Sequence, residues 1–574
     1  MNFNNCQFRG NAADEEGSAL SLIVYQGCQI SNCQFSANKA EPGNGVIYVE
    51  TDFECPTMST EPTSSPQTDI DRCIFEDNKG KDAGIALSCS QNAPVSIKNC
   101  QFQNCGSSGH VIAIQTDVQS TTIQNCSISN TDSIYSGGIC VHSNGKIEIF
   151  FINFVLTSVD SALSIQSEES TEKVSVTHCL FDSCSVNSYS CFYISAKTNS
   201  FEFKDITVKN VKISGCDDYL GSLNLNGQIT LALTNVSFTG VSSSCLYGGG
   251  TGMIFSGIPE LIFDKCNFVN NEAHQDKSKS RPLANSDTIP YYNGDCGAIQ
   301  IGCQAETAEM VLRFRDCNFR ENKAFWHGGA LAIQTIKELE LYNCKLEQNI
   351  VNCDFETSSS NLLFENYFHK KKDGRGGAIY LNPASGCVDS FTQNVIINDC
   401  KLSWNKAHDG YAIYIEGDDH GTEFNIIKNN FNDNCDPNNH DSNDPSIIYG
   451  AVIATEIWNF TKDTLWPPGK PENNNCFSQS DNNLQINELF HVDHSGRTQT
   501  KAFTESGYFP ADSFGASISF SYSAYFTNSS PFSPSDHFPS SRYFTDSDQF
   551  TKSSQFSESD PFSNSNWIKS FHKF

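Results

Sequence analysis

Cysteines and neighbouring carboxylates are the residues of this chain whose types and spacing could do chemistry. Three cysteine pairs share a C-x4-C spacing, and His178 adjoins the last of them: Cys28/Cys33, Cys100/Cys105 and Cys179/Cys184. Thiolates and imidazoles are zinc ligands, but a structural zinc site needs four convergent ligands, with two to four residues between paired ones. The repeat described below explains Cys105 and Cys184 by their position. We therefore predict no metal site and no cofactor.

Two acidic pairs are the nearest approach to an acid–base site. They are Asp217-Asp218 and Asp418-Asp419, the second followed by His420 and Gly421. Two carboxylates that flank a groove can act as acid and base in glycoside hydrolysis. Adjacent aspartates on a strand point to opposite faces, however, and in loops they are usually solvated. We therefore predict no catalytic residue, and the sequence does not decide whether Asp418-Asp419-His420 has a role.

A longer repeat positions most of the cysteines. The motif C-x-F-x-x-N recurs along the body of the chain with a unit of about 26–30 residues, interrupted by insertions. Full copies are Cys6-Phe8-Asn11, Cys33-Phe35-Asn38, Cys73-Phe75-Asn78, Cys266-Phe268-Asn271 and Cys317-Phe319-Asn322; leucine replaces phenylalanine in Cys344-Leu346-Asn349 and Cys400-Leu402-Asn405. Degenerate copies occur at Cys100-Phe102, Cys126-Ile128 and Cys179-Phe181. A fixed period of this length is typical of solenoid architectures.

Within one unit, apolar residues alternate with polar ones, which indicates strands. The clearest copy, residues 328–349, predicts three short strands separated by turns. We therefore predict an all-β fold in which residues 1–455 form a right-handed parallel β-helix. Equivalent residues of adjacent coils should stack about 4.8 Å apart as ladders. The cysteine and phenylalanine columns should face inward, and the asparagine column should bond from coil to coil at a bend.

The redox state of the cysteines stays open at this stage. The chain has 25 cysteines, many for a reducing compartment, and an odd number cannot all pair within one chain. Disulfides are one interpretation, and a column of unpaired, buried thiols is the other. Parallel side chains in register rarely offer the disulfide dihedral of about 90°. We therefore predict that Cys317 and Cys344 are not bridged to each other.

Composition excludes some partners. The chain has 574 residues and a formal net charge of −29, which argues against nucleic acids and anionic lipid surfaces. No apolar segment approaches the roughly 18 residues of a membrane span. The start, MNFNNCQFRGN, is unlike a signal peptide, and it already belongs to the repeat. The expectation is that the chain is a fragment of a longer protein.

The C-terminal part has a different period. Phenylalanine recurs every six residues, and serine stands three residues after each one. The phenylalanines are Phe514, Phe520, Phe526, Phe532, Phe538, Phe544, Phe550, Phe556 and Phe562. A hexapeptide left-handed helix would overpack its core with these rings. We predict that residues 503–574 are disordered or extended, and that residues 456–502 are a linker or a C-terminal cap.

These motifs resemble a known surface family. F-x-x-N together with G-G-A-[IL] is similar to the repeat of chlamydial polymorphic outer membrane proteins, and the F-[ST]-x-S-x-x hexads add a likeness to the related surface family of trichomonad parasites. The likeness covers residues 1–455 and 503–567. It implies a protein that is exposed at the cell surface or secreted, and whose partners are proteins or glycans of host or neighbouring cells. Members carry a signal peptide, a membrane span and a short cytoplasmic tail, none of which this sequence shows.

Two functions follow as hypotheses. The first is a non-enzymatic adhesion or interaction protein, for which Asn459 and Asn528 are candidate N-glycosylation sites. The alternative is a polysaccharide lyase or hydrolase-like β-helix enzyme. The G-H-G and R-I-K motifs of β-helical glycosidases are absent from the sequence. Acidic and basic residues clustered on one face of consecutive coils would favour the enzyme, whereas variable loops would favour adhesion.

Overall fold

The computed structural model describes residues 1–455 with gaps, together with residues 476–477 and 490–491. The gaps are residues 15–16, 25–26, 41–44, 52–66, 90–93, 108, 117–119, 133–136, 158–160, 187–189, 199, 214–218, 226–229, 244–252, 257, 275–295, 302–309, 326, 335, 352–373, 383–393, 408–409, 416–422, 433 and 435–452. The hexads of residues 503–574 therefore lie outside the described residues, as do Asn459 and Asn528.

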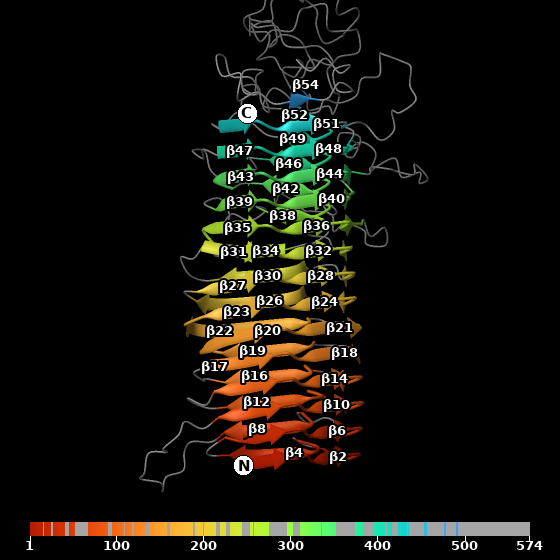
Figure 1. The fold of residues 1–574 in the computed structure, drawn as a ribbon, viewed down its shortest axis with the longest axis vertical. Helices are drawn as coiled ribbons and strands as arrows, with labels where there is room; N and C mark the ends of the chain where they lie inside the picture. Colours follow the sequence, from red (N-terminus) through yellow and green to blue (C-terminus); the bar gives the residue numbers. More distant parts are fainter. Residues whose placement is uncertain are drawn as a thin grey trace, which may run out of the picture. The chain divides into compact units, whose positions relative to one another are not determined.

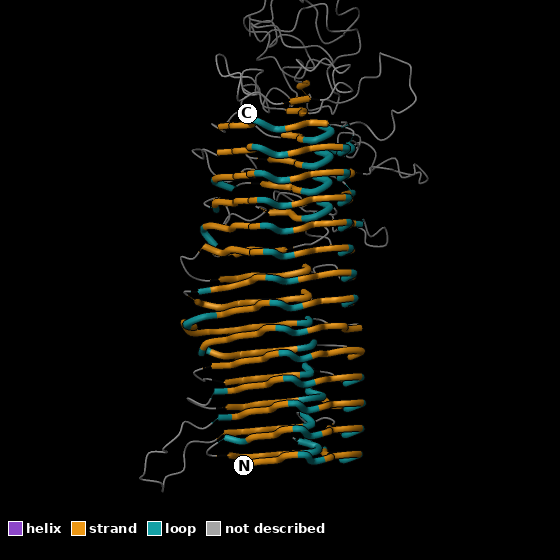
Figure 2. Tube along the Cα trace, in the orientation of Figure 1, coloured by secondary structure: helices purple, strands orange, loops and turns teal. Residues whose placement is uncertain are grey.

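Every regular element of the described residues is a β-strand, and every strand pairing is parallel (Figures 1 and 2). The strands stack in chain order as successive coils, and the first strand of each coil forms a 14-stranded sheet, here called sheet 1. The prediction of a right-handed parallel β-helix is confirmed. Sheet 1 contains β1 (Asn2–Asn4), β5 (Gln29–Ser31), β9 (Thr68–Asp71), β13 (Val95–Lys98), β17 (Ser120–Gln124), β20 (Lys146–Phe150), β23 (Val174–Thr177), β27 (Phe201–Lys204), β31 (Thr230–Thr234), β35 (Glu260–Asp264), β39 (Val311–Arg315), β43 (Glu338–Tyr342), β47 (Asn394–Asn398) and β50 (Glu423–Ile427).

The second strand of each coil carries the aromatic position of the repeat and forms sheet 2, with 15 strands. Two residues separate it from sheet 1 in each coil, as Asn5-Cys6 separates β1 from β2. Sheet 2 contains β2 (Gln7–Arg9), β6 (Gln34–Ser36), β10 (Ile74–Glu76), β14 (Gln101–Gln103), β18 (Ser127–Asp132), β21 (Asn153–Thr157), β24 (Leu180–Asp182), β28 (Thr207–Lys209), β32 (Ser237–Thr239), β36 (Asn267–Val269), β40 (Asn318–Arg320), β44 (Lys345–Glu347), β48 (Lys401–Ser403), β51 (Asn430–Asn432) and β53 (Cys476–Phe477).

The third strand of a coil is only two residues long, so sequence periodicity could not show it, and most coils have four strands rather than the three predicted. It follows sheet 2 after another two-residue bend and forms sheet 3, in segments of four and six strands. Sheet 3 contains β3 (Ala12–Ala13), β7 (Lys39–Ala40), β11 (Lys79–Gly80) and β15 (Gly106–Ser107), and then β25 (Ser185–Val186), β29 (Lys212–Ile213), β33 (Ser242–Ser243), β37 (Glu272–Ala273), β41 (Lys323–Ala324) and β45 (Ile350–Val351).

The fourth strand closes the coil and forms sheet 4, in segments of nine and six strands. Sheet 4 contains β4 (Leu20–Val24), β8 (Ile47–Thr51), β12 (Ile85–Cys89), β16 (Ile112–Thr116), β19 (Ile139–Ser143), β22 (Leu163–Thr171), β26 (Ser190–Thr198), β30 (Tyr219–Leu225) and β34 (Met253–Ser256), and then β38 (Ile299–Ile301), β42 (Leu331–Gln334), β46 (Ile379–Asn382), β49 (Ile413–Ile415), β52 (Ile453–Thr455) and β54 (Phe490–His491).

Connection length differs sharply between the two sides of sheet 4 and the rest of the coil. The bends from sheet 1 to sheet 2 and from sheet 2 to sheet 3 keep two residues wherever both strands are described. The connection into sheet 4 instead runs from Ala13 to Leu20 in one coil and from Val351 to Ile379 in another. The connection out of sheet 4 varies in the same way. Insertions in the sequence therefore enter the solenoid beside sheet 4.

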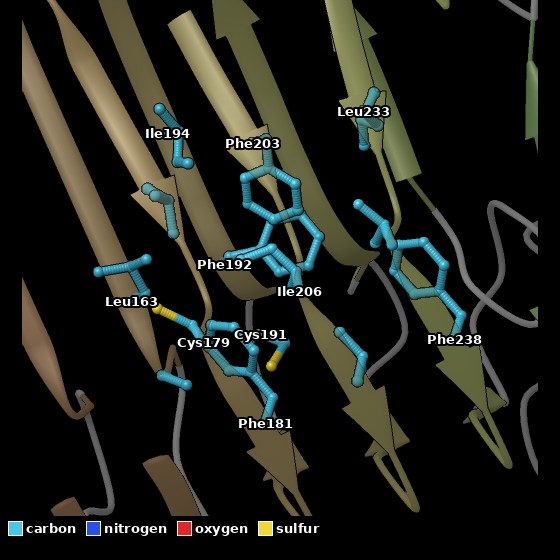
Figure 3. Packing of buried hydrophobic residues seen from close by; sticks show 14 of the residues in the cluster. Leu163, Cys179, Phe181, Cys191, Phe192, Ile194, Phe203, Ile206, Leu233 and Phe238 are labelled. Carbon is cyan, nitrogen blue, oxygen red and sulfur yellow. The ribbon is translucent and has the colours of Figure 1, made fainter. Parts of the chain in front are cut away.

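One continuous apolar core fills the interior of the coils. Figure 3 shows a section in which Cys179 and Cys191 lie among phenylalanine rings from several strands. Phe192 bridges two of these rings, with centroids 6.2 Å from Phe181 and 5.3 Å from Phe203. Inward side chains come from all four sheets. Each coil is capped above and below by adjacent coils, so its apolar side chains are buried only when coils stack.

Candidate functional site

The aromatic position of the repeat forms an inward column in sheet 2. Strand register aligns Phe8, Phe35, Phe75 and Phe102 in successive coils. Their ring centroids lie 4.9, 4.9 and 4.6 Å apart, and the rings are nearly parallel. Farther along, Phe268 stacks on Phe319 at 4.7 Å. These rings are almost completely buried beyond the first coil, so the column is part of the core.

The cysteine position lies in the bend between sheets 1 and 2. Its members point inward, and the thiols are free: Cys33, Cys73, Cys266, Cys317, Cys344 and Cys400 are buried, and Cys6 in the first coil is partly exposed. Each buried thiol hydrogen-bonds backbone carbonyls; the Cys344 Sγ lies 3.4 Å from both the Phe314 and the Tyr342 carbonyl oxygens. Burial raises the pKa of the Cys344 thiol and raises that of Cys179 to about 12. Such thiols are poor nucleophiles and poor metal ligands.

The asparagine position lies in the bend between sheets 2 and 3 and forms a buried ladder of amides. The Nδ2 of Asn322 donates to the Oδ1 of Asn349 and to the carbonyl oxygen of Phe268, both at 2.9 Å. Its Oδ1 in turn accepts the backbone N–H and the Nδ2 of Asn271. Two runs share this pattern: Asn11, Asn38 and Asn78, and then Asn271, Asn322, Asn349, Asn405 and Asn434. The amides are fully used by these bonds, so this ladder holds the fold.

Cysteine takes the asparagine position in two coils, as the sequence indicated. The Sγ of Cys105 lies 3.7 Å from the Phe75 carbonyl oxygen, and the Sγ of Cys184 lies 3.7 Å from that of Phe154. These are the contacts that an asparagine Nδ2 makes in other coils. Burial raises the pKa of Cys105 to about 12. Among the described residues, no group of three or more His, Cys, Asp or Glu side chains could hold a metal ion.

Each two-residue bend begins with a residue in the left-handed conformation. Between sheets 1 and 2 this residue directly precedes the cysteine position, and we call the resulting series the outer bend column. Its members are Asn5, Asn32, Arg72, Asn99, Asn125, Phe151, His178, Asp205, Asn235, Lys265, Asp316, Asn343, Asp399 and Lys428. Asparagine and aspartate tolerate positive φ best among residues with a side chain. The pairs Asn-Cys and Asp-Cys in the repeat are a sequence signal that could have revealed the column.

Side chains of the outer bend column face solvent and bond from coil to coil. Asn125 donates from Nδ2 to the Oδ1 of Asn99 at 2.7 Å, and Asn235 donates to the Oδ1 of Asp205 at 2.6 Å. Asn125 and Asn235 begin N-x-[ST] sequons, and both side chains are exposed. The column is thus a polar, exposed strip in contrast to the buried amide ladder.

A charged cluster on the outer face of sheet 1 is the arrangement closest to an active site. Arg313 on β39 pairs through Nη1 with Glu260 on β35, through Nη2 with Glu338 at 2.8 Å, and through Nε with Glu340 at 2.7 Å. Arg315 lies 3.9 Å from Glu340. All five side chains are solvent-accessible, and they come from three consecutive coils. Every side-chain nitrogen of Arg313 contacts a carboxylate, so the guanidinium charge is balanced within the cluster.

The sequence did not predict this cluster, and the acidic pairs that it did suggest lie elsewhere. Asp217-Asp218 and Asp418-Asp419-His420 fall outside the described residues. Arg313 and Glu260 are 53 residues apart because an insertion separates their coils. A fixed period could not have aligned them.

Comparisons with known proteins agree with the architecture. A family model described as a right-handed beta helix region matches residues 57–226. No curated protein and no solved structure matches the chain. The match extends over the coils from β9 to β30, which places the part of the outer bend column from Arg72 to Asp205 within it. The described residues contain no helix that is long and apolar enough to cross a membrane.

Proposed function

We propose that the chain is a non-enzymatic interaction protein, displayed at the cell surface or secreted, that contacts proteins or glycans of host or neighbouring cells. The observation that carries this proposal is the division of each coil into a constant and a variable part. Both bends of the constant part keep two residues, whereas both connections to sheet 4 change length from coil to coil. Solenoids that bind partners place their insertions on one face in this way.

The sequence motifs and the charge support the same proposal. The repeats resemble those of the polymorphic outer membrane protein-like surface family of trichomonads, whose members act at the cell surface. A net charge of −29 favours solubility and disfavours nucleic acids and anionic lipids as partners. The raised pKa of the buried Cys344 thiol and the hydrogen bonds of the amide ladder support a structural role for these two columns.

Binding of the full chain to cells tests this proposal. The labelled chain should bind host epithelial cells or cells of its own source saturably. Shortening the insertion at residues 352–373 or 275–295 to a short Gly-Ser linker should reduce this binding. As a control, a substitution that keeps the charge at a constant bend, such as Asp399→Glu, should leave binding unchanged. Absence of saturable binding to any cell tested would overturn the proposal.

One observation favours the second candidate, a carbohydrate-active enzyme. Acidic and basic side chains from consecutive coils do meet on one face of the solenoid, around Arg313. A catalytic base or acid must have an atom free to reach substrate. Here each carboxylate binds a guanidinium nitrogen through one oxygen, and a charge network on the surface also explains the arrangement.

Activity measurements separate the two candidates. Incubation with polyuronides, followed by absorbance of unsaturated products, detects lyase activity, and reducing-sugar release from neutral polysaccharides detects hydrolysis. We expect neither. Activity that Glu340→Gln abolishes, with folding retained, would establish the enzyme in place of the interaction protein.

A further inference from the structure

Two aromatic residues occupy bend positions where the backbone disfavours them. Phe151 has φ 56° and Trp404 has φ 60°, both in the left-handed region that bulky side chains rarely adopt. Their side chains are 51% and 52% exposed, so neither gains the burial that would offset an unfavourable conformation. Phe151 belongs to the outer bend column, where asparagine or aspartate fills most positions, whereas Trp404 lies in the bend that follows β48 of sheet 2. An exposed ring at a strained position is an outlier that points to a function.

Phe151 differs from Trp404 in its surroundings, because it is the centre of a small aromatic group. Phe150, the last residue of β20, also points outward, and its ring meets that of Phe151 edge-on at 5.9 Å between centroids. In the next coil, His178 takes the same bend position and stacks on Phe151 at 4.7 Å. Strand pairing fixes this geometry, because the Phe151 N–H donates to the Thr177 carbonyl oxygen and the His178 N–H to that of Lys204.

Polar groups flank the rings along the same column. On one side, the Oδ2 of Asp205 lies 3.2 Å from the Nε2 of His178, and Asn235 donates to its other oxygen. On the other side, Asn125 is exposed and joined to Asn99. The rings of Phe151 and His178 thus lie in consecutive coils, between the carboxylate of Asp205 and the amide of Asn125. We call Phe150, Phe151, His178 and Asp205 the aromatic patch.

We propose that the aromatic patch is a binding site for a neutral oligosaccharide. The inference rests on the proposed interaction function and names a ligand class for it. The apolar C–H face of a pyranose ring packs on an aromatic surface, where the negative face of the ring attracts C–H groups. Its hydroxyls bond to the carboxylate of Asp205, to His178 and to the Asn125 amide, all of which are exposed or half-buried.

Size and charge favour this occupant over others. Two phenylalanine rings and an imidazole offer far less apolar area than the roughly 800 Å² per partner of a stable protein interface. A single sugar residue needs no more than one or two rings. A carboxylate at the patch and the net charge of −29 disfavour sulfated or sialylated glycans. Successive coils also present equivalent polar positions at strand spacing, so an extended oligosaccharide can bond along the column.

The strained bend makes a clean test possible. Phe151→Asn removes the ring and places at this bend the residue that the column uses in other coils, so the fold is retained and the thermal midpoint should stay the same or rise. Binding of a panel of neutral glucose-, galactose- and mannose-containing oligosaccharides, including lactose and cellotetraose, is measured calorimetrically and by ligand-observed NMR. The full chain is produced in a host that does not glycosylate it, so that no glycan on Asn125 occupies the patch.

We expect at least one oligosaccharide of the panel to bind the native chain, with Phe151→Asn weakening the affinity about tenfold and His178→Asn about threefold. Trp404→Asn is the matched control, since it makes the same change at another strained bend, and it should change the affinity less than twofold. The inference is overturned if no oligosaccharide of the panel binds, if Phe151→Asn binds as tightly as the native chain, or if Trp404→Asn is the variant that loses binding. Cell binding measured in parallel keeps the two proposals apart, because saturable cell binding by a chain that binds no oligosaccharide of the panel overturns the patch and retains the interaction function.

Discussion

Truncation of one amide in the buried ladder should destabilise the solenoid far more than truncation of a half-buried, outward-facing amide in the same coil. Asn322 is fully buried, and its Oδ1 accepts the backbone N–H of Asn271 at 3.1 Å and the Nδ2 of Asn271 at 2.9 Å. Asn322→Ala leaves both donors without this acceptor in a dry interior. At roughly 1–3 kcal/mol for each buried donor that loses its partner, the free energy of unfolding should fall by about 2–6 kcal/mol.

Two further variants make the reasoning specific. Cysteine is tolerated at this position in the coils of Cys105 and Cys184, so Asn322→Cys should cost less than Asn322→Ala. Asn318 stands on β40 of the same coil and faces outward, and Asn318→Ala should cost less than about 0.5 kcal/mol. Urea denaturation measures the free energies, and amide hydrogen exchange at β40 and β44 shows whether the loss is local to these coils. Equal losses for Asn322→Ala and Asn318→Ala would refute the ladder as a source of stability.

Three other perturbations have expected outcomes. Because burial raises the pKa of Cys105 and Cys179 to about 12, these thiols should not react with iodoacetamide at pH 8 until urea unfolds the chain. Peptide mass spectrometry measures this reaction, and alkylation of Cys105 or Cys179 in the native chain would contradict the prediction. A Cβ on Gly137 would overlap the Ser161 carbonyl oxygen, so Gly137→Ala should lower the free energy of unfolding by about 2–4 kcal/mol. Gly106→Ala should be nearly neutral, because the atom nearest to its new Cβ would lie 3.9 Å away. Similar thermal midpoints for the two variants would show that the backbone shifts at Gly137 to accommodate the methyl group. Burial lowers the pKa of His110 to about 4, below its unfolded value of 6.5, so its contribution to stability is complete above pH 6.5 and is lost as the pH falls towards 4. His110→Asn should therefore flatten the pH dependence of the thermal midpoint between these two values, and an unchanged slope would contradict the assignment. Burial raises the pKa of neighbouring Asp82, and this group has the opposite effect on stability nearer pH 4.

The sequence predicted what strict periodicity encodes. Phe35, Phe75, Phe268 and Phe319 stand at equal offsets from the preceding cysteine, and the structure places these rings in a single inward column. An inward column tolerates little variation, because each side chain contacts its equivalents above and below. The outer bend column varies from asparagine to phenylalanine, since what the bend selects is a backbone angle rather than a side chain. The sequence therefore signals the outer bend column only in the coils where asparagine or aspartate precedes the cysteine.

The surface groups could not be aligned from the sequence for a different reason. Arg313 meets Glu340 after one regular period but reaches Glu260 only across the insertions of residues 275–295 and 302–309. The number of residues between coils then says nothing about which coils are adjacent. Phe151 and His178 are instead one regular period of 27 residues apart, so the repeat aligns them, and the pairing of β20 with β23 shows that they are neighbours.

The constant bends make one coil an exchangeable part. Since Cys317 and Cys344 hold equivalent positions, excision of residues 317–343 would bring Cys344 directly after Asp316, Leu346 over Phe268, and Asn349 next to Asn271. Each of these residues occupies the same repeat position as the residue that it replaces, so the new interface between coils resembles the other interfaces in the solenoid. Genes that encode such a chain can therefore lose or gain a whole coil by recombination between repeats without inventing a new interface. Length becomes a trait that varies in steps of one coil, and the spacing between surface loops varies with it.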